Sequence, residues 1–130
     1  MKILKKIVEE MIHQAIEGCG YLAGKDQVIT FFLPMTNIDA SPIHYSFDPN
    51  EQFQALKQAR ANDLDLMGVY HSHPASPAFP SKEDIRLAYD PDFSYIIVSL
   101  KNGKPEVNSF KISEGRVQQE TLQILNEECR

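Results

Sequence analysis

The sequence predicts an α/β fold, in which a single domain spanning residues 1–130 forms a mixed β-sheet flanked by helices. The length suits one hydrophobic core, and 42% hydrophobic and 24% charged residues are near the averages for globular proteins. Apolar residues at helical spacing alternate with short apolar runs bounded by glycine and proline. The predicted order is helix, two strands, helix, strand, helix and three strands.

The first three elements follow from apolar spacing and glycines. Apolar residues between 3 and 16 recur at helical intervals, so a helix is expected there, ended by Gly18 or Gly20. The stretch "CGYLAG" is too short for a helix and predicts a strand that turns into a second one, "QVITFFL".

The next region begins as a loop and continues as a helix. Residues 34–48 contain two prolines and several turn formers, and predict a loop with a short strand near 44–47. Asp48 can cap a helix and Pro49 suits its first position, so a second helix is expected over about 49–62.

The second half of the chain is richer in strands. "DLMGVY" predicts a strand that leads directly to His71, and a third helix is expected to begin at Ser81. A buried strand is predicted over 93–100, joined through an Asn-Gly hairpin to "EVNSFKI". The last strand is expected as one alternating segment over 117–125.

Charge and cysteine content narrow the partners and the compartment. The net charge of −5 argues against nucleic acid as a partner, and the cluster of Lys2, Lys5 and Lys6 is interpreted as a solvated helix face. Cys19 and Cys129 are too few for a disulfide framework, which favours a reducing compartment. No apolar run has signal-peptide or membrane-spanning character, so a cytoplasmic protein without a membrane partner is expected.

The stretch "VYHSHPASPAFPSKED" contains the residues that could bind a metal ion. In an extended chain His71 and His73 project to the same side, and Pro74 then ends the strand. A helix beginning at Ser81 can bring Asp84 back toward the two imidazoles. Two nitrogens and one carboxylate oxygen, with one position left open, form the ligand set of a catalytic zinc site.

Each of these features also has an ordinary structural interpretation. A His-x-His pair by itself is a weak signal and occurs more often in surface or loop positions. Ser81 and Asp84 can form a helix N-cap pair, which is compatible with a metal-binding role for the acid. His13 and His44, with Tyr45, are better explained by a solvated helix face and an edge strand. Cys19 is expected to be a small buried residue.

The sequence resembles the JAMM family of metalloproteases, also called MPN-plus or Mov34/MPN/PAD-1. The family pattern is an upstream glutamate, His-x-His-Pro, six residues, then Ser-x-x-Asp; it is matched by Glu17, His71, His73, Pro74, Ser81 and Asp84. The resemblance continues in "EGCGYLAG", "SPIHYSFDP" and "YIIVSL", and therefore covers nearly the whole chain. One departure is Ala15, where relatives often have proline.

The resemblance implies a JAMM/MPN-like fold and a role for each matching residue. His71, His73 and Asp84 would bind Zn²⁺, with water as the fourth ligand. Glu17 would be the general base, and Ser81 would stabilise the oxyanion of the tetrahedral intermediate.

The implied substrate follows from the small size of the chain, which has little room for the insertions that grip ubiquitin chains. It resembles compact bacterial Mec-type members, which act at the C-terminal tail of ubiquitin-like sulfur-carrier proteins. The expected function is therefore that of a zinc peptidase or isopeptidase. A hydrolase of another small peptide or amide, or a non-catalytic MPN-type scaffold, are the alternatives, and the oligomeric state stays open.

Overall fold

A computed structural model describes residues 1–13, 18–36, 47–73, 76–86, 88–101 and 103–126. The helices of these residues are α1 (Lys5–His13), α2 (Pro49–Ala61) and α3 (Lys82–Arg86). The strands are β1 (Lys2–Leu4), β2 (Cys19–Lys25), β3 (Val28–Pro34), β4 (Asp65–His73), β5 (Ser94–Ser99), β6 (Glu106–Ser113), β7 (Arg116–Glu120) and β8 (Gln123–Leu125). Within this part of the chain, no helix is long and apolar enough to cross a membrane.

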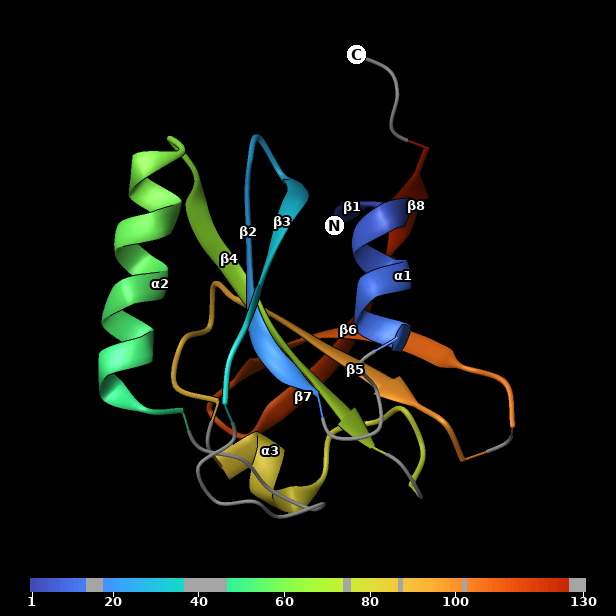
Figure 1. Cartoon of the computed structure of the whole chain (residues 1–130). Helices are drawn as coiled ribbons and strands as arrows, with labels where there is room; N and C mark the ends of the chain where they lie inside the picture. The colour runs from blue at the N-terminus through green and yellow to red at the C-terminus, as the bar shows by residue number, and fades with distance from the viewer. Residues whose placement is uncertain (14–17, 37–46, 74–75, 87, 102, 127–130) are drawn as a thin grey trace.

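The strands form one mixed sheet, as predicted. Their order is β7-β6-β5-β4-β2-β3-β1-β8. The pairs β4–β5, β1–β3 and β1–β8 are parallel, and the remaining pairs are antiparallel. In Figure 1 the sheet is strongly twisted, so that β5 and β6 cross the direction of β2 and β3, and α1 and α2 lie on opposite sides of the central strands.

The prediction that the chain begins directly as a helix is wrong for residues 2–4. These residues form β1, which pairs in parallel with β3 and β8, and the helix begins only at Lys5. Ile3 is completely buried there. Helical spacing continues through this segment by coincidence, because the partner strand β8 lies about 120 residues away and leaves no local signal. The predicted end of the helix lies partly outside the described residues.

The prediction of one last strand over 117–125 is also wrong. The segment is divided into β7 and β8, which lie at opposite edges of the sheet. Residues 121 and 122 carry the chain between them, and the Gln123 amide donates a hydrogen bond to the Met1 carbonyl at 2.9 Å. The chain leaves β6 after Glu120, although β6 extends to Glu106, and instead pairs with β1 at the opposite edge.

The other described elements agree with the prediction to within a few residues. Asp48 caps α2 by accepting a hydrogen bond from the Asn50 amide at 2.9 Å, and Pro49 occupies the first turn. In the "CGYLAG" strand, a Cβ on Gly20 would lie 2.5 Å from the Leu33 carbonyl oxygen, so glycine is required for β2 and β3 to approach. The short strand predicted near 44–47 falls mostly outside the described residues.

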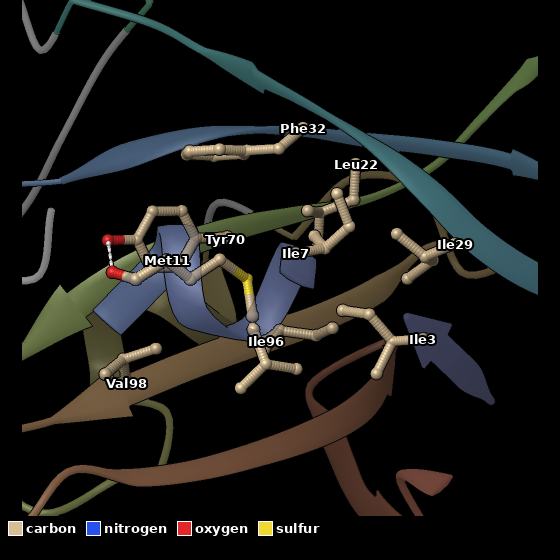
Figure 2. Close-up of a cluster of buried hydrophobic side chains, with 10 residues drawn as sticks. Ile3, Ile7, Met11, Leu22, Ile29, Phe32, Tyr70, Ile96 and Val98 are labelled. Carbon is tan, nitrogen blue, oxygen red and sulfur yellow. Dashed lines mark hydrogen bonds between the residues drawn. The ribbon is translucent and has the colours of Figure 1, made fainter. Parts of the chain in front are cut away.

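Strand β4 has a different environment on each face. Tyr70 belongs to the cluster under α1, which Figure 2 shows packed around Met11. That cluster consists of Ile3, Ile7, Val8, Met11, Leu22, Ile29, Phe32, Tyr70, Ile96 and Val98. Val69 points to the opposite face, where it packs with Ile97 and Phe110. Because side chains alternate along a strand, His71 and His73 share the face of Val69.

Candidate metal centre

The end of β4 places both predicted histidines where one ion could contact them. His71 pairs with Cys19 of β2 on one side and with Ile97 of β5 on the other, and His73 pairs with Ser99. This central position makes the strand rigid and leaves His71 9% and His73 4% exposed. The two Nε2 atoms lie 3.0 Å apart.

Asp84 reaches the histidines because its helix begins with a reciprocal cap. The Ser81 amide donates to Asp84 Oδ2 at 2.8 Å, and the Asp84 amide donates to Ser81 Oγ at 3.1 Å. The capped turn directs the carboxylate at β4: Oδ1 lies 3.0 Å from His71 Nε2, and Oδ2 lies 3.1 Å from His73 Nε2. The predicted N-cap is therefore present, and the same local structure directs the carboxylate of the candidate ligand toward both imidazoles.

The three side chains fit a metal ion by their donor types and spacing. Candidate ligand atoms of His71, His73 and Asp84 all lie within 4.8 Å of one another. Two ligands of a tetrahedral zinc ion, at about 2.0–2.1 Å from it, are about 3.3 Å apart. The observed separations of 3.0–3.1 Å are within a few tenths of an ångström of this value.

Electrostatics keep the acid in its metal-binding form. Burial alone would raise the pKa of Asp84, but hydrogen bonds from His71 and His73, the charge of His71 and the Ser81 amide outweigh it and hold the pKa well below its usual range. Burial would lower the pKa of His73, but the hydrogen bonds to Asp84 and to the Pro77 carbonyl raise it overall. The carboxylate is thus ionised at neutral pH, as ligation requires.

The remaining sequence candidates divide into two groups. His13 is exposed at the end of α1, and Cys19 is a buried free thiol in β2, which agrees with their structural interpretations. The other candidates lie outside the described residues: Glu17, His44, Tyr45, Pro74 and Cys129.

Two contributors to the site were not predicted. The Pro77 carbonyl lies 2.8 Å from His73 Nδ1. Ser72, on the opposite face of β4, accepts a hydrogen bond from the Gly18 amide at 3.2 Å and donates its own amide to the Gly18 carbonyl at 3.1 Å. A contact made by a backbone carbonyl cannot be predicted from the sequence, because every residue has one. Apart from its position between the two histidines, nothing in the sequence indicates that Ser72 contacts Gly18.

The fold and the site together define a JAMM-type metallopeptidase, because two strand histidines and a helix aspartate surround one point at the end of a mixed sheet. The chain belongs to the family described as prokaryotic homologs of the JAB domain, whose model matches residues 3–113. The recognition made from the sequence motif is therefore confirmed.

Two relatives support membership of this family, and two solved structures share its fold. The chain is 34% identical over 114 residues to the CysO-cysteine peptidase of Mycobacterium tuberculosis, covering 85% of this chain and 78% of the relative. It is 31% identical over 111 residues to the desampylase of Pyrococcus furiosus, covering 85% and 77%.

The solution structure of a Desulfitobacterium hafniense protein is similar with a TM-score of 0.87 and 42% identity, covering 97% of this chain and 93% of that one. A JAB1/MPN domain protein from Archaeoglobus fulgidus has the same fold, with a TM-score of 0.66 and 18% identity over 97% of this chain and all of that one.

Proposed function

We propose that the protein is a zinc-dependent peptidase or isopeptidase that hydrolyses an amide bond at the C-terminal tail of a ubiquitin-like protein of the sulfur-carrier type. The convergence of His71, His73 and Asp84 carries this proposal. The relatives support the substrate class, since one is a CysO-cysteine peptidase and another a desampylase. A scaffold protein would have no need for this ligand set.

Zinc is the ion that suits these ligands best. Two imidazole nitrogens and one carboxylate oxygen are typical of catalytic zinc sites, and structural sites more often use thiolates. Cys19 is adjacent to His71 across the sheet, but its thiol contacts the Met35 carbonyl. A zinc ion held by the three side chains would act as a Lewis acid and lower the pKa of water at its open position to about 7.

Glu17 is proposed as the general base. The residue after it, Gly18, is held against Ser72 by two hydrogen bonds, and Ser72 lies between the two histidines on β4. This contact places Gly18, the residue that follows Glu17 in the sequence, at the same end of the sheet as the histidines. Glu17 would accept a proton from the attacking water and pass it to the amine as the C–N bond breaks.

Ser81 is proposed to stabilise the oxyanion of the tetrahedral intermediate. Its Oγ accepts the Asp84 amide hydrogen bond as a helix cap. A hydroxyl has one donor hydrogen as well as its acceptor lone pairs, so capping leaves the O–H free to donate. One preorganised donor of this kind contributes roughly 3 kcal/mol to transition-state stabilisation.

The test is incubation of the zinc-loaded protein with a ubiquitin-like sulfur carrier extended by one amino acid beyond its C-terminal diglycine. Intact mass should show loss of the added residue. Glu17→Gln should retain zinc and lose roughly 10²–10⁴-fold in turnover, because it removes the base and no ligand. Glu10→Gln, an exposed glutamate of α1, is the matched control and should behave as wild type. Equal turnover by Glu17→Gln would exclude Glu17 as the base.

A further inference from the structure

The turn that follows the two histidines presents three consecutive carbonyls, each with its own partner. The Ser76 carbonyl accepts a 2.6 Å hydrogen bond from the Ser99 hydroxyl, and the Ala78 carbonyl accepts one of 3.0 Å from Asn108 Nδ2. The carbonyl between them, that of Pro77, lies 2.8 Å from His73 Nδ1. The carbonyl that contacts the proposed metal ligand is thus held from both sides.

The two donors stand on the same face of the sheet as the histidines. Across β4, β5 and β6 the register aligns His71 with Ile97 and Asn108, and it aligns His73 with Ser99. Register partners point to the same side, so Ser99 and Asn108 rise toward the turn beside the imidazoles. The sheet therefore provides the ligands from one strand and the supports of the turn from the next two.

Both supports are held in place by further contacts. Ser99 is 2% exposed, and its Oγ also accepts the Lys101 amide at 3.1 Å. The turn itself packs through Ala78, which is buried among Val69, Ile97 and Phe110. Removing one polar support would therefore leave the turn attached to the sheet. The Pro77 carbonyl would keep its 2.8 Å hydrogen bond from the Phe79 amide but would lose one of the two flanking anchors that fix its direction.

The direction of the Pro77 carbonyl matters for metal binding. A neutral imidazole carries one proton, and a carbonyl at Nδ1 requires that proton to be there. Nε2, which faces His71 and Asp84, would then give up its hydrogen bond to Asp84 on metal binding and offer its lone pair to the ion. Such partners of metal-binding histidines fix ring orientation and tautomer.

We propose that Ser99 and Asn108 are positioning residues, which orient the Pro77 carbonyl and thereby hold His73 in the tautomer and orientation that bind the metal. This inference rests on the proposed function, because it assigns His73 as a ligand. It predicts that Ser99 and Asn108, which would not contact the ion, control the metal affinity and the coordination geometry of the site.

The experiment is titration of metal-free protein with Co²⁺, followed by visible absorption, for wild type, Ser99→Ala, Asn108→Ala and the double variant. Each single variant should weaken Co²⁺ binding several-fold, and the double variant by roughly 10–100-fold. The ligand-field bands should also change in intensity or position, because a loosened His73 alters the coordination geometry. A purely structural role would lower thermal stability without changing the spectrum of the bound ion.

Control variants distinguish a specific effect on His73 from the effect of losing any side-chain hydrogen bond. Asn62→Ala removes a 2.8 Å hydrogen bond from Nδ2 to the Gln58 carbonyl at the C-cap of α2. This cap precedes the first residue of β4, whereas the two histidines lie at its last residues. It should leave Co²⁺ affinity unchanged. Ser99→Thr keeps the hydroxyl and should restore most of the affinity lost in Ser99→Ala. If Ser99→Ala does not fold, Asn108→Ala, on a half-buried side chain, decides the question.

The outcomes distinguish this inference from the function on which it rests. Absence of Co²⁺ binding in the wild type would overturn the proposed metal site and this inference with it. Tight binding by the wild type, with unchanged affinity and spectrum in the double variant, would overturn only the positioning role. Weakened binding with an altered spectrum, confined to the Ser99 and Asn108 variants, would support it.

Discussion

The two faces of β4 differ in chemistry, although their residues alternate along one strand: one face packs apolar side chains and the other buries polar ones. On the α1 face, Tyr70 is fully buried, its ring meets Phe32 edge to face at 5.5 Å, and its hydroxyl donates to the Met11 carbonyl at 2.9 Å. Figure 2 shows this hydrogen bond at the margin of an otherwise apolar cluster. Burial stabilises this face.

The opposite face buries ionisable side chains, and their removal from water costs free energy. His71, His73 and Asp84 are each at most 9% exposed and satisfy one another through separations of 3.0–3.1 Å. Such a cluster contributes little net stability, because desolvation offsets the attraction between its members. The α1 face therefore stabilises the strand, and this stability allows the other face to keep a polar cluster that could hold a metal ion.

The largest expected effect is on the polar face. Asp84→Ala should abolish stoichiometric zinc binding, because a direct ligand matters more than the surrounding groups, whose loss already costs roughly 10–100-fold. Zinc per chain after dialysis, measured by mass spectrometry, checks this. Glu83→Ala on the same turn of α3 is the matched control, since Glu83 pairs with Arg86 instead. Retained zinc would remove Asp84 from the ligand set.

The next effect belongs to the apolar face. Tyr70→Ala should lower the free energy of unfolding by about 3–5 kcal/mol, because it leaves a cavity under α1. Urea denaturation of the metal-free protein provides the measurement. The folded fraction should still bind one zinc ion, since the side chain points away from the ligands. Weaker zinc binding by folded Tyr70→Ala would show that the two faces are coupled.

A smaller effect is expected for the reactivity of Cys19, which pairs with His71 across β2 and β4. Burial, and secondarily the charge of Glu51, raises the pKa of Cys19 to about 11, so at pH 8 little thiolate is present in the folded state. In a Cys129→Ser background, a disulfide reagent at pH 8 should modify Cys19 roughly 100-fold more slowly in the folded than in the unfolded protein. Equal rates would mean that solvent reaches β2 next to the site.

The smallest effect should come from Tyr70→Phe. This change preserves the ring and removes only the hydroxyl that donates to the Met11 carbonyl. We expect a loss of about 1 kcal/mol in the free energy of unfolding, measured by the same urea denaturation. A loss as large as that of Tyr70→Ala would show that the hydrogen bond, and not the packing, dominates this face.

Much of the site could be predicted from the sequence because its geometry is local. Alternation along an extended chain aligns His71 with His73, and a Ser-x-x-Asp cap directs Asp84 at them. Elements with strong local signals, such as α2 with its Asp-Pro start, were also predicted closely. The predictions are wrong where strands pair with distant partners: the sequence predicts a helix at β1, and a single strand over the residues that form β7 and β8.

Local sequence therefore specifies the identity and order of the candidate ligands and the face of the strand on which the histidines lie, because side-chain direction has a fixed local period. Only the tertiary structure decided that Ser99 and Asn108 reach the turn beside His73, that Gly18 rests on Ser72, and that β8 closes on β1. These contacts join residues from about 20 to 120 positions apart. They depend on the pairing of strands that are far apart in the sequence, and local periodicity carries no information about that pairing.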